Sequence, residues 1–573
     1  MSADLVTNAG VAARPADAEH SDLLAPTVLS RRSRRDGVWI VVALITFSAA
    51  VFCAGLWTPW PWSDEGATYL ALLRDWNHLP ALYAGPDAPM VPYYIVAKAW
   101  TTLIQGAWPS LSTLVATRLL SAAAATATAG LLYAFVARNA GRLAGGLAGV
   151  ALVGLAGFDR YAQEARPYAL LALTATASWL MWDRWSRPHV VPTFLGVVDA
   201  PTVAGHRWHR TAPAASYVLS LAVTAVIHTF GLFQWPAQAL ASMLVVPEQR
   251  AGRLRRVVLL AALMSAAAAL AAAQVAASLM HGTGPPGPAG ARVVGAWTIL
   301  TQLARGMSAT PQPAASAVVL ALAAVGAMGC VRGDHVRFAR TLLVWLIVPL
   351  ALELALAAFR TNLFRLHYWI AFLPPIAALM ALGAMTVASA VATTAQRWGG
   401  GTGPALAAKA EAPLIASVAL AAICVQIPAG LPAQLAVRSA TGHGEDLSGL
   451  LTLVAQARDE HPGVRVLIDN RSATGIIGAA DPRLEAENPL RRLDPSSPVV
   501  YTRLTSTRSV QAEIGDAATL LWIYKGNVTK AGAPGRMPRS LASLHATVVW
   551  ATATGSGWTV LLLTVPPTRR SSP

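Results

Sequence analysis

"VWIVVALITFSAAVFCAGLW", residues 38–57, is a run of twenty residues without a charged side chain. A segment inside a lipid bilayer has no water to satisfy its backbone, so it crosses as a helix of roughly 20 mostly apolar residues. Similar runs recur as far as residue 431. Only 13% of the chain is charged, whereas soluble domains average about a quarter. The sequence therefore predicts a mostly α-helical protein that crosses a membrane many times.

We count eleven apolar runs as predicted spans of a transmembrane helical bundle over residues 38–431. Residues 1–37 are polar and are predicted to be a disordered cytoplasmic segment. Residues 59–112 are rich in Trp, Tyr and Pro, and are predicted to form a long outer loop with one or two helices in the membrane interface, where such aromatic side chains prefer to lie. The predicted spans are 38–58, 117–137, 143–158, 167–183, 212–232, 233–247, 257–279, 314–331, 341–358, 368–393 and 413–431.

The distribution of positive charge predicts the orientation of these spans. The basic cluster "RRSRRDG" (31–37) directly precedes the first span, and Lys and Arg near span ends favour the cytoplasmic side. With the spans alternating, the predicted inner segments hold nineteen Lys or Arg. The predicted outer loops hold nine when Arg118, at the outer end of the span 117–137, is counted with them. We therefore expect a multi-pass protein of the plasma membrane, with its N-terminus cytoplasmic and residues 432–573 extracytoplasmic.

The last part of the chain, residues 432–573, differs from the bundle in composition. A helical stretch, "EDLSGLLTLVAQARDEH" (445–461), precedes short β-branched or aromatic runs bounded by turn residues, a pattern typical of strands. These runs are "GVRVLIDN" (463–470), "SPVVYTRL" (497–504), "TLLWIYKG" (519–526) and "WTVLLLTV" (558–565). The pattern predicts a small α/β domain.

Net charge and cysteine content exclude two other classes of protein. The net charge is +16, but it is dispersed and forms no basic stripe of the kind that binds nucleic acid. Cys53, Cys330 and Cys424 all lie in apolar runs, at a spacing that fits neither a zinc site nor a disulfide framework. We interpret them as small core residues.

On the predicted topology, polar segments from five parts of the chain meet at the outer face. Ionisable residues at membrane depth are costly, and they commonly mark a pathway or an active site. The segments are "WPWSDEGATYL" (60–70), "DAPMVPYY" (87–94), "DRYAQEARPYAL" (159–170), "HTFGLFQ" (228–234) and "FRTNLFRLHY" (359–368).

Each of these polar residues also has a structural interpretation. Asp64 could cap the N-terminus of an interfacial helix that begins at the next residue. Glu164 and Arg166 could form a structural ion pair at the start of a helix. His228 could be a satisfied histidine at a helix end, and Arg365 could be an anchor that extends to the membrane surface. The sequence leaves these alternatives open for each residue alone, and the gathering of five segments at one face favours a functional site.

The combination of motifs resembles the glycosyltransferase C superfamily. The similarity is greatest to family 39-like membrane enzymes, such as protein O-mannosyltransferases and lipid A aminoarabinose transferases, and the composition resembles that of actinobacterial members. It extends over about residues 38–390 and is carried by "WSDEGATYL", "DAPMVPYYIVAKAW", "YAQEARPYALLALTA", "HTFGLFQWPAQAL" and "LHYWIAFLPPIAALMALG". This chain has "PMVPYY" (89–94) where the family often has His-Pro-Pro-Leu-Tyr-Tyr.

The resemblance implies a reaction: a sugar, mannose or arabinose-like, moves from a polyprenyl-phosphate donor to an acceptor hydroxyl with inversion. The hydroxyl needs a base within hydrogen-bond reach, and the leaving phosphate needs fixed positive donors. For these roles we assign Asp64 as the base, assisted by Glu65 as a second catalytic residue. The donor phosphate is assigned to Arg166, Arg74, Arg365 and the weaker candidate Lys98, and substrate binding to Glu164, Tyr94, His228 and His367.

Three questions stay open at this point. A Mg²⁺ or Mn²⁺ ion bridging Asp64 and the phosphate suits a carboxylate site, but the sequence does not decide whether one is used. The acceptor is a cell-envelope glycan or glycolipid, which the C-terminal domain favours, or alternatively a secreted protein. A transporter or flippase is the alternative from another class, although such proteins often show internal repeats, and none is apparent in this sequence.

Overall fold

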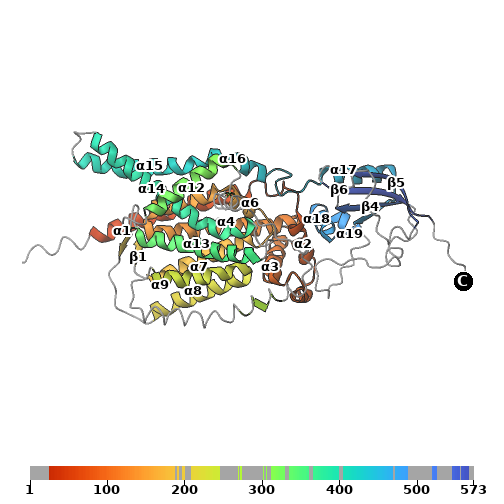
Figure 1. Cartoon of the computed structure of the whole chain (residues 1–573), viewed down its shortest axis with the longest axis horizontal. Coiled ribbons are helices and arrows are strands. Elements are labelled where there is room, and N and C mark those ends of the chain that lie inside the picture. Colours follow the sequence, from red (N-terminus) through yellow and green to blue (C-terminus); the bar gives the residue numbers. More distant parts are fainter. Residues whose placement is uncertain are drawn as a thin grey trace, which may run out of the picture.

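The computed structural model describes most of the bundle and parts of the C-terminal region. The described residues are 25–187, 190–192, 197–199, 208–244, 312–329, 335–359, 366–398, 404–468, 471–487, 519–525, 545–554 and 557–566, with a few isolated residues between 269 and 305. Figure 1 shows a long bundle of helices with a smaller unit at one end, which contains the strands near the C-terminus.

The bundle is built from helices that coincide with the predicted apolar runs. They are α1 (Ala25–Cys53), α4 (Thr113–Ala140), α5 (Arg142–Val153), α6 (Ala156–Ala162), α7 (Tyr168–Ser186), α8 (Trp208–Ile227), the 3₁₀ helix η3 (Thr229–Phe233), α9 (Gln234–Leu244), α12 (Pro313–Met328), α13 (Val336–Phe359), η5 (Leu366–Phe372), α14 (Leu373–Trp398), α15 (Pro404–Cys424) and α16 (Gln426–Val437). The predicted span 257–279 lies almost wholly outside the described residues.

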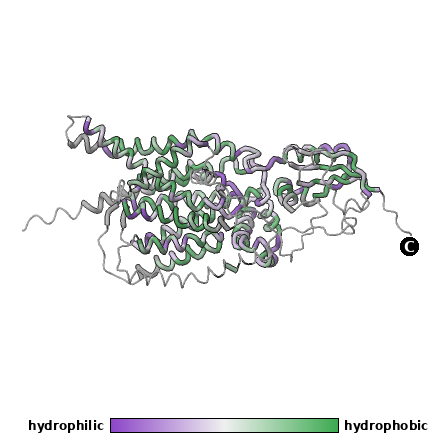
Figure 2. Tube along the Cα trace, viewed as in Figure 1, coloured by the Kyte–Doolittle hydropathy of each residue, from purple (hydrophilic) through white to green (hydrophobic). Residues whose placement is uncertain are grey.

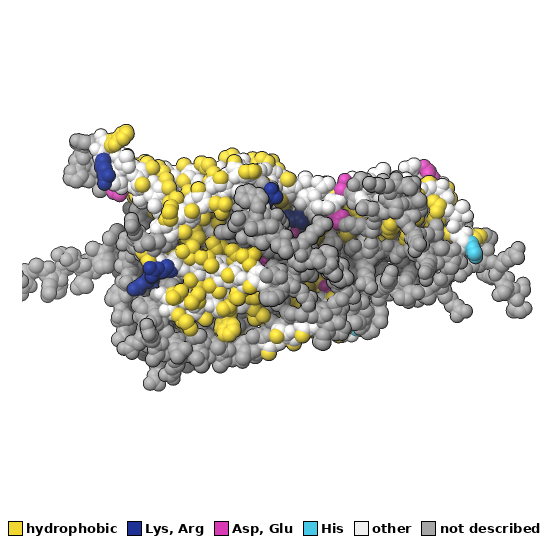
Figure 3. Space-filling model, viewed as in Figure 1, with side chains coloured by type: hydrophobic (Ala, Val, Ile, Leu, Met, Phe, Trp, Pro, Cys, Tyr) yellow, Lys and Arg dark blue, Asp and Glu magenta, His cyan; other side chains and the backbone are white. Residues whose placement is uncertain are grey.

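Among the described residues, four helical stretches are long and apolar enough to cross a membrane, or five when a bent pair counts as one span. The pair is α5 with α6, whose axes differ by 71°. Large apolar side chains remain exposed on the bundle, as expected where lipid rather than water surrounds the helices; Leu219 is 65% exposed and Ile347 is 55% exposed. Hydrophobic side chains cover much of the visible face of the bundle (Figure 3). The fold is that of a membrane-embedded helical protein, and the count of eleven spans stays a prediction.

The two ends of the bundle differ from the predicted boundaries. Helix α1 begins at Ala25, so it includes part of the segment 1–37 that the sequence predicts to be disordered; residues 1–24 lie outside the described part. At the other end, α16 continues to Val437, beyond the predicted limit at residue 431. Both helices extend past their apolar runs because polar residues at a membrane surface can continue a helix whose backbone bonds are already formed.

The predicted outer loop 59–112 contains two α-helices and two 3₁₀ helices. These are α2 (Ser63–Leu72), η1 (Trp76–Ala84), η2 (Ala88–Met90) and α3 (Val91–Ala107). Pro89 and Pro92 are the second residues of η2 and α3, within the first turn, where a missing N–H costs nothing. In the predicted inner loop 184–211, β1 (Val190–Pro192) and β2 (Val197–Asp199) form a short antiparallel pair.

The C-terminal region is an α/β unit, as the sequence predicts. It contains α17 (Ser448–Glu460), β3 (Arg465–Ile468), α18 (Arg471–Ala480), α19 (Pro482–Glu487), β4 (Thr519–Lys525), β5 (Thr547–Ala553) and β6 (Trp558–Thr564). The sheet order is β3-β4-β6-β5, with β3 parallel to β4 and the other pairs antiparallel. Three strands match predicted runs, β5 was not predicted, and the predicted strand 497–504 lies outside the described residues.

Hydrophilic residues concentrate where the bundle meets the C-terminal unit (Figure 2). Helix α2 lies at this junction and contacts α18 directly. The break between α5 and α6 falls at Gly154 and Leu155, and the loop after α6, 163–167, contacts α2 through Ala165 and Arg166. The fold thus brings the first loop, the loop after α6 and the start of the C-terminal unit to one place.

Candidate active site

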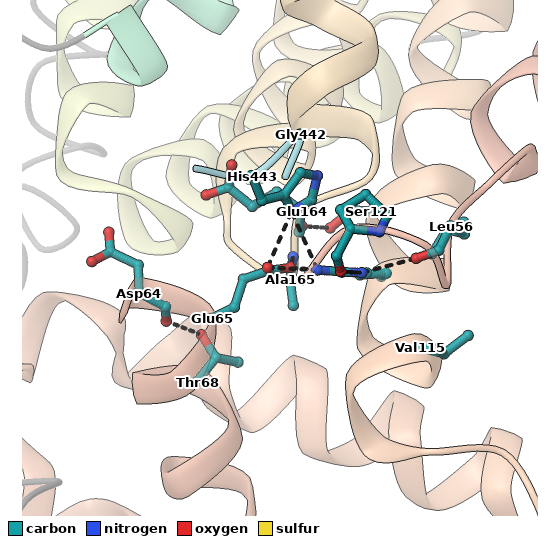
Figure 4. A network of polar contacts seen from close by, with 12 residues as sticks. Leu56, Asp64, Glu65, Thr68, Val115, Ser121, Glu164, Ala165, Gly442 and His443 are labelled. Carbon is teal, nitrogen blue, oxygen red and sulfur yellow. Dashed lines mark hydrogen bonds and ion pairs between the residues drawn. The ribbon is translucent and has the colours of Figure 1, made fainter. Parts of the chain in front are cut away.

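Asp64 and Glu65 lie in the first turn of α2, and their side chains take different directions. The helix begins at Ser63, and Trp62 at its N-cap makes no side-chain capping bond. The prediction that Asp64 could be the N-cap is therefore wrong, although an acid in the first turn still suits the helix dipole. Glu65 is fully buried, whereas the Asp64 side chain is 36% exposed and points away from the Glu65 network in Figure 4.

Both carboxylate oxygens of Glu65 have two partners. Arg118 donates from Nε to Oε1 at 2.8 Å and from Nη2 to Oε2 at 2.7 Å. The backbone N–H of Ala165 donates to Oε1 at 2.8 Å, and Nδ1 of His443 lies 3.1 Å from Oε2. Burial alone would raise the pKa of Glu65, but Arg118 and His443 together outweigh it and hold that pKa well below its ordinary range. Glu65 is therefore an ionised, fully satisfied carboxylate.

Arg118 ties this carboxylate to the chain that leaves α1. It is fully buried in the first turns of α4, and its Nη1 donates to the carbonyl oxygens of Leu56 and Pro59, each at 2.9 Å. A buried guanidinium is stable only where its N–H groups are paired. Arg118 thus fixes the start of α4, the segment before α2, and Glu65 in one network.

Asp64 faces Arg166 across a looser contact. Asp64 Oδ2 lies 3.5 Å from Arg166 Nη2, and Arg166 Nη1 donates to the Asp64 carbonyl at 3.4 Å and to Thr68 Oγ1 at 3.5 Å. These separations exceed the usual 2.7–3.2 Å of N–H···O bonds. A carboxylate and a guanidinium held this loosely attract each other but retain capacity for further hydrogen bonds.

The loop that carries Glu164 and Arg166 is held from two sides. Gln163 Nε2 donates to the carbonyl oxygens of Phe52 and Ala54, at 3.1 and 2.7 Å. Ser121 Oγ donates to the Glu164 carbonyl at 2.6 Å. These bonds connect the loop to α1 and α4, so the position of Arg166 is set by the bundle.

The Glu164 carboxylate pairs with Arg160, whose Nε lies 3.4 Å from Oε2, rather than with Arg166 as one sequence interpretation has it. Arg166 instead forms its ion pair with Asp64. Glu164 is fully buried, and burial raises its pKa to about 8; Arg160 opposes this rise, while Glu65 and Asp64 add to it. Burial thus favours the neutral form of Glu164, and Arg160 favours the ionised form.

Aromatic rings from three elements line the region next to Arg166. Tyr168 stacks on His367 with ring centroids 4.8 Å apart and lies 5.9 Å from His228. The structure therefore brings the two predicted substrate-binding histidines close to the same tyrosine. His228 also caps the N-terminus of η3, because its Nδ1 accepts the backbone N–H of Phe230 at 3.2 Å. Tyr94 is fully buried and lies within electrostatic reach of Arg166.

The remaining predicted phosphate ligands lie in different situations. Lys98 donates to the carbonyl oxygens of Leu72, at 2.8 Å, and of Arg74, an arrangement that satisfies the end of α2. Arg74 is buried. The pKa of Asp87 is raised because burial outweighs the opposing effect of Arg166 and Arg74. Both arginines therefore lie near Asp87. Arg365 lies outside the described residues.

Sequence reasoning missed several members of this site. Arg118 has a signal, because it is a charge just inside the predicted span 117–137. Asp87 lies within a segment that the sequence marks as polar, but it was not singled out. His443 is separated from Glu65 by 378 positions, and no motif surrounds it.

Among the residues that the structure describes, no three His, Cys, Asp or Glu side chains come close enough to form a metal site of their own. Mg²⁺ often needs only one or two protein carboxylates together with a substrate phosphate. A Mg²⁺ or Mn²⁺ ion at Asp64 therefore stays a prediction, and no step below depends on it.

Comparison with known proteins identifies no relative by sequence. No protein-family model matches the chain, and no curated protein does. Among solved structures, ArnT from Cupriavidus metallidurans bound to undecaprenyl phosphate is similar over 91% of this chain and 97% of its own, at 11% identity and a TM-score of 0.49. The oligosaccharyltransferase of Archaeoglobus fulgidus is similar over 79% and 64%, at 12% identity and a TM-score of 0.46. Similarity of this degree assigns neither a reaction nor a substrate.

Proposed function

We propose that the chain is an integral membrane glycosyltransferase that moves a sugar from a polyprenyl-phosphate donor to an acceptor hydroxyl. The observation that carries the proposal is the Asp64–Arg166 pair: a partly exposed carboxylate lies 3.5 Å from a guanidinium at one end of a bundle of apolar helices. A base and a phosphate-binding cation are the two groups that this reaction needs. The motifs around both residues resemble the glycosyltransferase C superfamily.

In the proposed mechanism, the Asp64 carboxylate accepts the proton of the acceptor hydroxyl. The hydroxyl oxygen then attacks the anomeric carbon of the sugar. The bond between that carbon and the phosphate oxygen breaks, its electron pair passes to the phosphate, and the anomeric configuration inverts. Arg166 donates N–H groups to the phosphate as its negative charge grows, which lowers the barrier because the guanidinium is already in place.

In this proposal Glu65 has a different role from Asp64. Both of its oxygens are already occupied by Arg118, Ala165 and His443, and freeing one would leave a buried donor unpaired. We therefore assign Glu65 as a positioning residue that holds α2, although the sequence pairs it with Asp64 in catalysis.

The neighbouring groups complete a donor site. Arg74 lies near Asp87, as Arg166 does, and could add positive charge for the phosphate. The stacked rings of Tyr168 and His367 offer an apolar surface for a sugar face. The raised pKa of the nearby Glu164 limits the negative charge that would repel the phosphate. The lipid part of the donor would lie along the exposed apolar helices.

The sugar and acceptor are proposed from the resemblance and the predicted topology. We propose a mannose or arabinose-like donor sugar, a cell-envelope glycan or glycolipid as acceptor, and an active site on the extracytoplasmic side of the plasma membrane. Profiling of lipid-linked sugars in cells that lack the protein tests this, because the unused donor and acceptor should both accumulate. Accumulation of under-glycosylated secreted proteins instead would identify a protein acceptor.

Substitution of Asp64 tests the reaction itself. The purified full-length chain is supplied with polyprenyl-phosphate-linked radiolabelled mannose or arabinose and a cell-envelope extract. Asp64→Asn should lower the transfer rate by at least about 100-fold, the usual minimum contribution of a general base. Asp459→Asn, which changes an exposed acid in α17, is the matched control. Transfer by Asp64→Asn at the wild-type rate would refute the base assignment, and movement of the lipid across a bilayer without transfer would identify a flippase.

A further inference from the structure

The segment that follows α16 turns back into the candidate active site. The Arg438 guanidinium pairs with Asp159 of α6 at 2.7 Å. Arg160 Nη1 donates to the Gly442 carbonyl at 2.6 Å, and the backbone N–H of Trp60 donates to the Ala440 carbonyl at 2.8 Å. Three bonds thus hold residues 438–443 against both the α6 region and the segment that leads into α2.

His443, at the end of this segment, contacts the central ion pair. Its side chain is buried, and Nδ1 lies 3.1 Å from Glu65 Oε2 and 3.2 Å from Arg118 Nη2. Burial lowers the pKa of His443 to about 4 despite the opposing effect of Glu65, so the ring is neutral at pH 7. A neutral Nδ1 that donates to Glu65 joins the C-terminal segment to α2 directly. One that accepts from Arg118 joins it to α4, and Arg118 in turn holds Glu65 of α2 (Figure 4).

A second contact between the C-terminal unit and α2 depends on two glycines. Gly66 follows Glu65, and a Cβ added to Gly66 would lie 2.6 Å from the Gly475 carbonyl carbon in α18. A Cβ added to Gly475 would lie 2.5 Å from the Gly66 carbonyl oxygen. The two backbones therefore touch, and neither position has room for a side chain. Trp60, just before α2, also packs against the core of the C-terminal unit.

We propose that residues 438–446 and α18 form a clasp that sets the position of α2, with His443 and Gly475 as its positioning residues. The inference rests on the proposed function, because α2 carries Asp64. Helix α2 has only ten residues, too few to be stable alone, so its orientation depends on what packs against it. An error of about 1 Å in the position of a reacting group can cost about 100-fold in rate. The extracytoplasmic unit is thus part of the catalytic apparatus.

Four variants of the full-length chain test the clasp. His443→Ala removes the ring, whereas His443→Asn keeps an amide that can donate or accept near the position of Nδ1. Gly475→Ala pushes α18 against Gly66 and leaves the ion pair chemically intact. Gly449→Ala is the matched control, because its Cβ would meet only Thr554 at an ordinary 3.4 Å. Amide hydrogen exchange of Ser63–Leu72 is measured for each variant, together with transfer from polyprenyl-phosphate-linked mannose.

In His443→Ala and Gly475→Ala, exchange of the α2 amides should rise at least about tenfold and kcat should fall at least about tenfold, with the donor KM within about twofold of wild type. His443→Asn should recover most of both losses, and Gly449→Ala should match wild type. Should His443→Ala not fold, Gly475→Ala and the Asn variant still decide the matter.

Wild-type exchange in α2 for both His443→Ala and Gly475→Ala would overturn the clasp, and so would equal losses in His443→Asn and His443→Ala. The exchange measurement needs no substrate. If the wild-type protein transfers no sugar, the proposed function fails, and exchange still reports on the clasp separately.

Discussion

At the scale of single residues, the adjacent acids Asp64 and Glu65 are the most informative pair. Neighbouring residues on a helix are turned about 100° from each other, so only one of them can face the bundle interior. Glu65 does so and is satisfied by Arg118, and Asp64 remains partly exposed beside Arg166. One acid is therefore suited to structure and the other to chemistry, a distinction that adjacency in the sequence conceals.

The first prediction concerns the buried ion pair. Arg118→Met should lower the free energy of unfolding by about 3–5 kcal/mol, because it leaves the Glu65 charge buried without its main partner. Thermal unfolding of the detergent-solubilised protein measures the change. The double variant Glu65→Gln with Arg118→Met should recover part of the loss, since no buried charge remains. Equal stability of Arg118→Met and wild type would contradict the assigned role.

The second prediction concerns pH and Glu164. Burial raises the pKa of this carboxyl to about 8, above the value near 4.3 expected in an unfolded chain. A raised acid contributes stability that is complete below the unfolded pKa and is lost as pH rises through the folded pKa. The wild-type melting temperature should therefore fall relative to that of Glu164→Gln between about pH 4.5 and 8. Parallel curves for the two proteins across this window would show that Glu164 is ionised throughout.

At the scale of elements, glycines decide how closely helices approach. Helices α12 and α14 cross where a Cβ on Gly326 would lie 1.9 Å from the Leu379 carbonyl oxygen, and one on Gly383 would lie 2.0 Å from that of Leu322. Small residues at such crossings let helices pack where lipid supplies no hydrophobic driving force. The sequence predicts both helices from their apolar composition, but it does not predict that these two are partners.

The third prediction tests this crossing. Gly383→Ala should destabilise the protein by about 1–3 kcal/mol or more, as overpacking does when a backbone rather than a flexible side chain is in the way. Gly329→Ala is the control, because its nearest neighbour would be Thr386 Oγ1 at 3.4 Å. Thermal unfolding in detergent distinguishes them. Equal melting temperatures would mean that the two helices can separate at little cost.

At the scale of the whole molecule, the candidate site lies where the bundle meets the C-terminal unit (Figures 1 and 2). Residues from α1, α2, α4, the loop after α6 and the segment after α16 all contribute to it. A site built from so many parts depends on the whole chain being folded, so separate expression of the bundle or of the C-terminal unit would not reproduce it.

The fourth prediction tests the orientation of the molecule. In a variant without the three native cysteines, Ala455→Cys in α17 should react with a membrane-impermeant thiol reagent on intact cells. Ala395→Cys near the end of α14 should react only after permeabilisation. Both positions are exposed in the structure, so access across the membrane alone separates them. The reverse labelling pattern would invert the predicted topology.

The sequence by itself determined the helical character of this protein and the parts of the chain that carry polar groups. Charge-free runs form helices because a backbone in lipid must satisfy itself within its own segment, and this is a local property that can be read residue by residue. The strand runs of the C-terminal unit follow from local composition in the same way. β5 (Thr547–Ala553) has this composition too, with the turn residues "TGSG" (554–557) after it, although it was not predicted.

Only the tertiary structure decided which polar groups meet. Glu65 is held by Arg118, 53 positions away, and by His443, 378 positions away, and no local pattern links residues so distant. They come from α2, α4 and the segment after α16, and α2 also touches α18 through Gly66 and Gly475. Composition determines that a buried charge must find partners, but the packing of the whole chain selects those partners.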